Sequence, residues 1–328
     1  MIITRTPLRI SFSGGGSDLP SFYRKHGGCV VSTTIDKYIY LTLQDSFTPG
    51  ISTIKYSKVE SFESVDKINH PIFRECMLGF DVDSLEMSSM ADIPAGTGLG
   101  SSSSFTVGLI NLMSQYKKLN YGKESLARKA CDLEINKLGE PIGKQDQYAA
   151  AYGGLNYYKF NQDDTVDVIP VNLSTEKKKK LNDNMILMYT GIIRSASDIL
   201  VKQDSNIEKG TGADKNLLEM CDLTDNFFKD LKKGNISAMG DILDKGWNLK
   251  KTLAEGISSN EIDRAYKAAI DAGAEGGKLL GAGGGGFLLF YADNEFHDEI
   301  EKSLPEYRRI PFRFDGTGSA TIYNDNTK

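Results

Sequence analysis

The sequence predicts an α+β fold of two domains, and three features of the chain support this. Residues 85–93 read as a strand that leads through a glycine–serine run, 94–104, directly into an apolar helix. The second half is dominated by helical periodicity and ends in a strand–helix–strand order, which suits a helical layer on an antiparallel sheet. The chain has 328 residues, 40% of them hydrophobic, which is enough for two packed domains. We place the boundary near the lysine-rich run 176–180, which gives domains 1–180 and 181–328.

The first domain is expected to open on strands. Residues 2–12 alternate apolar and polar side chains and end in a glycine-rich run, 14–18, which is followed by a short segment, 19–26. Residues 29–43 are rich in β-branched and aromatic side chains and read as two strands separated near Asp36-Lys37. Further strands are expected near 51–57, 84–91, 155–160 and 166–171, and helices near 70–79, from the serine run to about 118, at 124–138 and at 144–152.

The second domain is expected to be mainly helical. Trp247 lies in an amphipathic pattern with Leu243 and Leu249 and is expected in the core, whereas the lysine run 176–180 is expected to face solvent. A glycine-rich run, 276–286, leads into an apolar strand. Strands are expected near 184–190, 287–292, 308–314 and 320–323, and helices near 194–205, 212–233, 235–254, 260–271 and 295–303.

The glycine–serine run has the features of an anion site. It reads Pro94-Ala95-Gly96-Thr97-Gly98-Leu99-Gly100-Ser101-Ser102-Ser103-Ser104. Glycines let the backbone close on a ligand, serine is a preferred helix cap, and a helix start offers free N–H groups and the positive end of the dipole. Phosphate is the usual ligand of such a site. Because no lysine follows Gly100 as it does in the common P-loop, we expect a magnesium ion to supply positive charge for the γ-phosphate.

Composition and charge exclude several classes of function. The net charge of −5 provides no global basic field for nucleic acid or an anionic membrane. No apolar run reaches the roughly 18 residues needed to span a bilayer, and no signal peptide is recognisable. The four cysteines are scattered, so we expect no zinc site or disulfide framework and a cytoplasmic protein with small-molecule partners.

Three glycine-rich runs together resemble the GHMP kinase family, which includes galactokinase, homoserine kinase and mevalonate kinase. The first is Pro7-x-Arg9-Ile10 followed by Gly14-Gly15-Gly16-Ser17-Asp18. The second is the run 94–104, which resembles the family's ATP loop, and the third is 278–287, similar to its G-A-G-G-G-G-F loop with Gly283 and Gly284. The resemblance implies an N-terminal domain of ribosomal-protein-S5 type, a ferredoxin-like C-terminal domain and an active site between them. ATP would be bound by Pro94, Gly96, Gly98, Leu99, Gly100, Ser101, Ser102 and Ser103.

The resemblance also implies roles for charged residues. Glu134 and the segment Gly143-Lys144-Gln145-Asp146-Gln147 match the family's magnesium ligand and its G-x-x-D-Q segment. Ser102, with Ser101 as the alternative, and Glu134 would then hold Mg²⁺, which prefers few protein oxygens. Asp146 would accept the proton of the acceptor hydroxyl, and Arg9 would steady the developing charge. On the residues alone, Glu134 could instead be an edge residue of an apolar arc, and Asp146 a carboxylate at a helix start.

Departures from galactokinase indicate a different sugar. Galactokinases carry Glu and His where this chain has Gly15 and Gly16, so only Asp18 remains of those contacts. Together with 139–147 and Tyr189-Thr190-Gly191-x-x-Arg194, the loop 14–18 most resembles bacterial D-glycero-D-manno-heptose 7-phosphate kinases. These would phosphorylate the anomeric hydroxyl to give the 1,7-bisphosphate, on the way to nucleotide-activated heptose. The loop 14–18 would contact the sugar, and Lys144 or Arg194 would bind the distal phosphate.

Three alternatives stay open at this point. A kinase of a neutral sugar, such as L-fucokinase or a galactokinase-like enzyme, would act well on an unphosphorylated hexose. A catalytically silent sugar and ATP sensor would consume no ATP, although retention of Arg9, Ser102, Glu134 and Asp146 argues against it. The decarboxylase branch of the family would act on mevalonate diphosphate.

Overall fold

The computed structural model describes residues 1–192, 196–210 and 212–325, and within them it confirms the expected mixture of helices and sheets. A nine-stranded sheet has the order β13-β1-β2-β5-β3-β4. Strands β6 and β12 also pair with β2, and β7 pairs with β6. Its strands are β1 (Ile2–Ser13), β2 (Gly28–Asp45), β3 (Ser52–Lys55), β4 (Val59–Phe62), β5 (Leu85–Ala91), β6 (Asn156–Phe160), β7 (Val166–Pro170), β12 (Phe314–Asp315) and β13 (Ala320–Asn324). A four-stranded antiparallel sheet comprises β11 (Arg308–Arg309), β8 (Met185–Tyr189), β10 (Phe287–Tyr291) and β9 (Gly276–Leu279).

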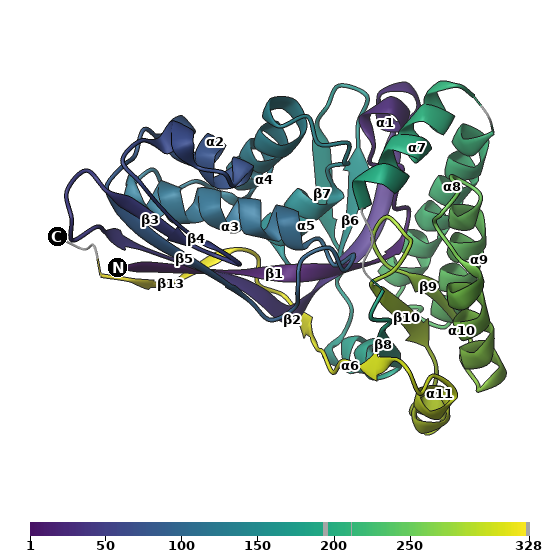
Figure 1. Cartoon of the computed structure of the whole chain (residues 1–328). Coiled ribbons are helices and arrows are strands. Elements are labelled where there is room, and N and C mark those ends of the chain that lie inside the picture. Colours follow the sequence, from purple (N-terminus) through teal and green to yellow (C-terminus); the bar gives the residue numbers. More distant parts are fainter. Residues whose placement is uncertain (193–195, 211, 326–328) are drawn as a thin grey trace.

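Helices cover the large sheet on one face and surround the small sheet at one end of the molecule (Figure 1). The first group comprises α2 (Pro71–Phe80), α3 (Ser101–Tyr116), α4 (Lys123–Cys131) with its π-helical continuation η2 (Asp132–Lys137), and α5 (Gln145–Tyr152). The second group comprises α7 (Ala196–Glu208), α8 (Ala213–Lys232), α9 (Met239–Lys251), α10 (Asn260–Asp271) and α11 (His297–Ser303). The remaining elements are α1 (Pro20–His26), α6 (Thr175–Asp183) and the short turns η1 (Val65–Lys67) and η3 (Asn294–Phe296).

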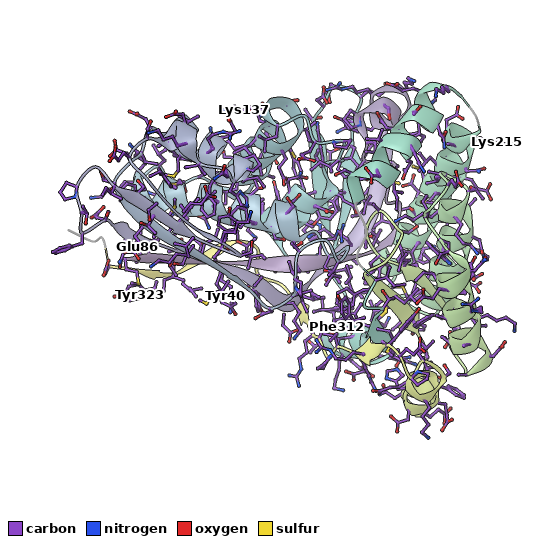
Figure 2. All side chains as sticks on the ribbon, viewed as in Figure 1. Tyr40, Glu86, Lys137, Lys215, Phe312 and Tyr323 are labelled. Carbon is purple, nitrogen blue, oxygen red and sulfur yellow. The ribbon has the colours of Figure 1, made fainter. Side chains whose placement is uncertain are left out.

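Within the described part of the chain, the opposite face of the large sheet is open at the end formed by β5 and β13, whereas α8 packs against β1, β2 and β6 at the other end. Tyr40 and Tyr323 point from the strands away from the helices, on the far side of the sheet from Lys137 (Figure 2). The N-terminus lies at the end of the large sheet remote from the small sheet, where the amino group of Met1 pairs with Asp325. Among the described residues, no helix combines the length and apolar character that a membrane crossing requires.

Two strand predictions are wrong. The strand expected near 308–314 is two short strands, β11 in the small sheet and β12 in the large sheet. The expected break at Asp36-Lys37 is a β-bulge inside a single long strand, because both halves of β2 pair with β1 and the register shifts there between Pro7 and Leu8. A bulge absorbs the extra residues without reversing the chain. Short β4 and β9 were not anticipated, the latter because two of its four residues are glycines.

Burial confirms the expected core and surface. Trp247 is fully buried in the cluster that joins α8, α9 and α10 to the small sheet. The lysine run 176–180 forms the exposed part of α6. The boundary at 180/181 stays a prediction, and the last strands, β12 and β13, return to pair with β2 and β1 of the large sheet.

Candidate active site

A cavity of about 260 Å³ lies where the large sheet, the glycine-rich loops and the helices α7 and α9 meet. Its walls come from parts of the chain that are far apart in sequence, from β1 to the loop after β9. The lining includes Arg9, Gly15, Gly16, Asp18, Gly96, Gly98, Gly100, Ser101, Ser102, Ser103, Glu134, Gln145, Asp146, Gln203, Lys250 and Gly281. Most of the residues predicted to bind ATP, metal and sugar therefore meet in one place.

The helix α3 presents its N-terminus to this cavity. Gly100, not a serine, occupies the N-cap position, with a left-handed φ of +74° that glycine adopts without strain. Among the described residues, no side chain caps this end, and Ser101 is already the first helical residue. The first N–H groups of α3, next to the positive end of its dipole, are thus available to a phosphate.

The ATP loop and the third glycine loop touch each other through their backbones. A Cβ on Gly98 would lie 2.6 Å from the carbonyl oxygen of Leu280, and a Cβ on Gly281 would lie 2.4 Å from the Cα of Gly98. Both glycines have positive φ, +84° and +72°. Only glycine permits this approach, so the third loop serves as the support for the ATP loop.

Arg9 and Asp146 form a largely buried, bidentate ion pair in the cavity. The Nε of Arg9 donates to Oδ1 of Asp146 at 2.8 Å and its Nη2 donates to Oδ2 at 2.9 Å. The third arm of the guanidinium, Nη1, donates to the carbonyl oxygen of Gly98 at 2.6 Å. Because the side chain of Arg9 is only 4% exposed, one arginine fixes the carboxylate of Asp146 against the ATP loop.

Asp18 joins the first glycine loop to the helix that carries Asp146. Its Oδ1 accepts from the backbone N–H of Gly16 at 2.9 Å, and its Oδ2 accepts from the N–H of Gln145 at 3.1 Å, at the start of α5. Burial, and secondarily the nearby charge of Asp146, raise the pKa of Asp18. Besides its predicted contact with the sugar, Asp18 therefore fixes the position of α5 relative to the first glycine loop.

Glu134 lies on the π-helical turn η2, and it is 1% exposed. Its Oε1 accepts from the hydroxyls of Ser102, at 3.1 Å, and Thr106, at 3.0 Å, while Oε2 accepts from Nε2 of Gln147 at 2.7 Å. Burial raises the pKa of Glu134, and these hydrogen bonds oppose that rise. π-Helical turns of this kind occur often at functional sites.

These groups fit a magnesium ion. In the described part of the chain, no three acidic, histidine or cysteine side chains converge on a metal position. Mg²⁺ instead takes one or two protein oxygens together with phosphates and water. A buried carboxylate beside a serine hydroxyl, both on the cavity wall, matches this requirement.

Several predicted residues support the loops without lining the cavity. Leu99 is buried and its carbonyl accepts from the N–H of Arg9, and the hydroxyl of Ser17 donates to the carbonyls of Gly14 and Cys29. Pro94, Gly14, Gly283 and Gly284 likewise lie in the loops but outside the lining. Arg194 falls outside the described residues.

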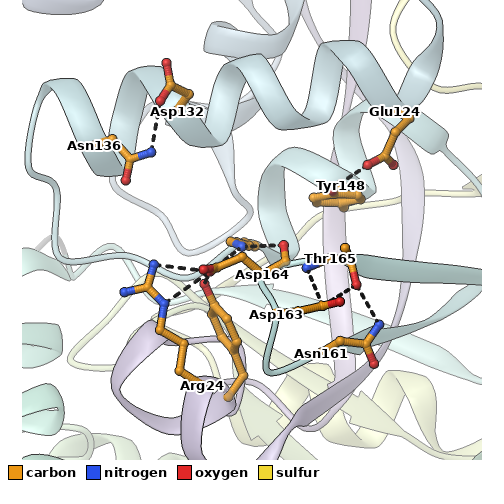
Figure 3. Close-up of polar contacts among 11 residues, drawn as sticks. Arg24, Glu124, Asp132, Asn136, Tyr148, Asn161, Asp163, Asp164 and Thr165 are labelled. Atoms are coloured by element: carbon orange, nitrogen blue, oxygen red, sulfur yellow. Dashed lines mark hydrogen bonds and ion pairs between the residues drawn. The ribbon is translucent and has the colours of Figure 1, made fainter.

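The structure does not bring Lys144 to the cavity. Its Nζ donates to the carbonyl oxygen of Asp164 at 2.9 Å and lies 3.1 Å from Oδ1, in a separate pocket beside α1. Arg24 joins the same carboxylate, as Figure 3 shows, with Asp132 and Asn136 on a neighbouring helical turn. The physical reason is helix geometry: residues two apart at the start of α5 point in different directions, so Asp146 enters the cavity and Lys144 leaves it.

Sequence reasoning missed several residues of the lining, among them Gln203 and Lys250. Gln203 on α7 is 1% exposed, and its Nε2 has no hydrogen-bond partner among the described residues. Lys250 on α9 is 6% exposed and donates to the carbonyl oxygen of Gly281. A signal for Lys250 was available, because it continues the buried face of α9 that Leu243 and Trp247 define at helical spacing.

Comparison with known proteins gives matches over both halves of the chain. The model of the GHMP kinases N terminal domain matches residues 68–154, and the model of the GHMP kinases C terminal domain matches 227–307. A D-glycero-alpha-D-manno-heptose 7-phosphate kinase of Campylobacter jejuni is 34% identical over an alignment of 318 residues that covers 92% of this chain and 93% of that protein.

Solved structures agree over nearly the full length. A D-glycero-D-manno-heptose 1-phosphate kinase from Bacteroides thetaiotaomicron has a TM-score of 0.81 at 26% identity, and the match covers 99% of this chain and 100% of that one. The galactokinase of Lactococcus lactis has a TM-score of 0.77 at 17% identity, with 98% of this chain and 95% of that one covered, and shows the shared fold.

Proposed function

The chain belongs to the GHMP kinase family, and on that basis we propose that it transfers the γ-phosphoryl group of ATP to the anomeric hydroxyl of D-glycero-D-manno-heptose 7-phosphate. One observation supports phosphoryl transfer in particular: the Arg9–Asp146 pair lies in a cavity bounded by two glycine loops and the N-terminus of α3. The choice of sugar is supported by the end-to-end similarity to the Campylobacter jejuni kinase.

The proposed mechanism assigns one task to each group. The free N–H groups at the start of α3 bind phosphate oxygens of ATP, and a carboxylate oxygen of Asp146 takes the proton of the attacking hydroxyl. Arg9 holds that carboxylate in place and presents positive charge beside it. Mg²⁺, held by Ser102 and Glu134, would neutralise charge on the phosphates.

Sugar hydroxyls have candidate partners on the same wall. Oε1 of Gln145 and Nε2 of Gln203 are buried atoms that have no hydrogen-bond partner among the described residues, and both side chains line the cavity. A buried polar atom without a partner costs free energy, which a bound hydroxyl would recover. The two glycines of the loop lie against these same side chains, because a Cβ on Gly15 would be 3.5 Å from Nε2 of Gln145 and a Cβ on Gly16 would be 2.4 Å from Nε2 of Gln203.

The distal phosphate requires a cation as well. Arg194 remains the candidate from the sequence, whereas Lys144 would first have to leave Asp164. Charge-assisted hydrogen bonds to phosphate contribute about 1.5–3 kcal/mol each. Loss of two such bonds would lower kcat/KM for the unphosphorylated sugar by roughly 10²–10⁴-fold.

The test compares four acceptors at equal concentration with ATP and Mg²⁺: heptose 7-phosphate, free heptose, L-fucose and galactose. We expect the heptose phosphate to turn over fastest by the factor just given. Faster turnover of any neutral sugar would reject heptose 7-phosphate as the acceptor and support only the general assignment as a sugar kinase. ATP consumption that does not depend on sugar would contradict sugar kinase activity.

A further inference from the structure

Lys250 stands out because its ammonium group is buried where the cavity is already charged. It reaches the cavity wall from α9, far in sequence from the ATP loop and the first glycine loop. The charged groups that act on it are Arg9 from β1, Asp18 from the loop after β1, Asp146 from α5 and Lys278 from β9. Burial of an ammonium beside Arg9 and Lys278 is unfavourable, and Asp18 and Asp146 offset this cost only in part, so a further anion would stabilise the site.

Lys250 and Arg9 are each held by the backbone of a glycine loop. Nζ of Lys250 donates to the carbonyl oxygen of Gly281, and Nη1 of Arg9 donates to the carbonyl oxygen of Gly98. Gly98 and Gly281 are the two glycines whose backbones touch. Each cation is thus fixed by one of the two contacting loops, and both line the cavity that contains Asp146.

The ATP loop itself provides no such cation. In the P-loop a lysine of the loop reaches the β- and γ-phosphates, whereas Ser101, Ser102 and Ser103 follow Gly100 here. Phosphoryl transfer depends on neutralising charge that spreads over the oxygens of the transferred group. A lysine next to the ATP loop and to Asp146 is positioned for this task.

We infer that Lys250 binds the non-bridging oxygens of the γ-phosphoryl group of ATP and supplies, from the C-terminal half of the chain, the positive charge that the ATP loop lacks. During transfer, the bond from the γ-phosphorus to the β–γ bridging oxygen breaks and the bond to the acceptor oxygen forms. The hydroxyl proton goes to Asp146, and Lys250 keeps its own protons. The inference rests on the proposed kinase function and adds a residue to it.

The test measures binding, without sugar, of ATP and of ADP at fixed Mg²⁺, by calorimetry. In Lys250→Met, the affinity for ATP should fall by roughly 10–10²-fold while the affinity for ADP stays within about threefold, since only ATP carries the γ-phosphoryl group. Lys250→Gln keeps a hydrogen-bond donor for the carbonyl of Gly281 but has no charge, so we expect it to lose the preference for ATP over ADP as well. The matched control is Lys251→Met, which removes a neighbouring charge that lies over the ring of Trp247.

Each other outcome counts against the inference. Equal losses for ATP and ADP, or recovery of ATP binding in Lys250→Gln, would make Lys250 a support for the third loop only. An unchanged ratio of ATP to ADP affinity with weaker binding of heptose 7-phosphate would assign Lys250 to the acceptor. A wild-type protein that binds no ATP would overturn the proposed function, whereas an active wild type with unchanged discrimination in Lys250→Met overturns this inference alone.

Discussion

Two charged clusters start from the same turn of α5, and they differ in almost every physical respect. Asp146 pairs with Arg9 inside the cavity, with side chains that are 23% and 4% exposed. Lys144, two residues earlier, pairs outside it with Asp164, which also binds Arg24. The side chain of Lys144 is 12% exposed, but those of Asp164 and Arg24 are 47% and 55% exposed. In sequence the two clusters use the same kinds of residue.

The difference in exposure separates a chemical site from a surface ion pair. Exposed pairs contribute about 0–1 kcal/mol because water and salt screen them. A buried pair is different, because removal of one partner leaves an uncompensated charge at a cost of about 3–5 kcal/mol. The Arg9–Asp146 pair is also tied to the ATP loop through Gly98, and within the described residues the Asp164 cluster has no such link.

The largest effect is expected for Asp146→Asn. Loss of the proton acceptor should lower kcat by roughly 10²-fold or more, while ATP still binds, because the loop and α3 remain. The matched control is Asp164→Asn, the same change in the surface cluster, which should leave kcat within about twofold. Steady-state kinetics that show near-normal kcat in Asp146→Asn, or equal losses in both variants, would remove the distinction between the clusters.

A smaller loss is expected when the magnesium ligands are changed. Glu134→Gln and Ser102→Ala should each lower turnover roughly 10-fold or more and shift the Mg²⁺ concentration for half-maximal rate upward. Titration of the rate with Mg²⁺ measures this shift. Glu124→Gln serves as the control, because Glu124 binds Tyr148 and Tyr152 in this same region. If the rate of Glu134→Gln depends on Mg²⁺ concentration as the wild-type rate does, Glu134 has a structural role and does not bind the metal.

Lys250 gives a prediction about stability and pH. Burial first, and then Arg9, lower the pKa of Lys250 to about 8, against partial opposition from Asp18 and Asp146. Between about pH 8 and about 10.5 the unfolded chain binds more protons at Lys250 than the folded chain does. The buried ammonium therefore lowers the free energy of unfolding by its full amount below about pH 8, and this loss of stability decreases as pH rises toward about 10.5. Lys250→Met should therefore raise the free energy of unfolding by about 1–3 kcal/mol at pH 7, with no gain above about pH 10.5.

Denaturant unfolding at neutral pH and at about pH 10.5 measures this difference, again with Lys251→Met as the control. A Lys250→Met protein that is less stable than wild type at neutral pH would mean that the bond to Gly281 outweighs the cost of the buried charge.

The smallest effect is expected for Lys144→Ala. Because Lys144 is held by Asp164 away from the cavity, the Michaelis constant for heptose 7-phosphate should change by less than about twofold and stability by less than about 1 kcal/mol. If the Michaelis constant for the sugar phosphate instead rises by roughly an order of magnitude while that for ATP stays normal, Lys144 turns into the cavity when the sugar phosphate binds.

The two glycine loops that line the cavity, 14–18 and 94–104, are contiguous motifs and could be recognised in the sequence. The structure also brings Arg9 and Asp146 into contact, while their roles in the reaction stay predictions. The helices with strong apolar periodicity were also predicted, since their buried faces are encoded within a few turns.

What could not be predicted depends on contacts between distant parts of the chain. Lys250 and Gln203 enter the cavity only because α7 and α9 pack beside the loops. Helical spacing places Lys250 on the buried face of α9, but it does not indicate which site the side chain faces. The direction of Lys144 was likewise set by Asp164, a residue in the turn between β6 and β7. The bulge at Asp36-Lys37 required knowledge that β1 pairs along most of β2.

The position of the new phosphate tests the proposed reaction most directly. Heptose 7-phosphate, ATP and Mg²⁺ are incubated with the protein, and the product is examined by phosphorus and proton NMR. We predict a second phosphate ester whose phosphorus couples to the anomeric proton, formed by the wild type and lost in Asp146→Asn. A phosphate on any other carbon, or release of ADP with no new ester, would contradict the proposed reaction.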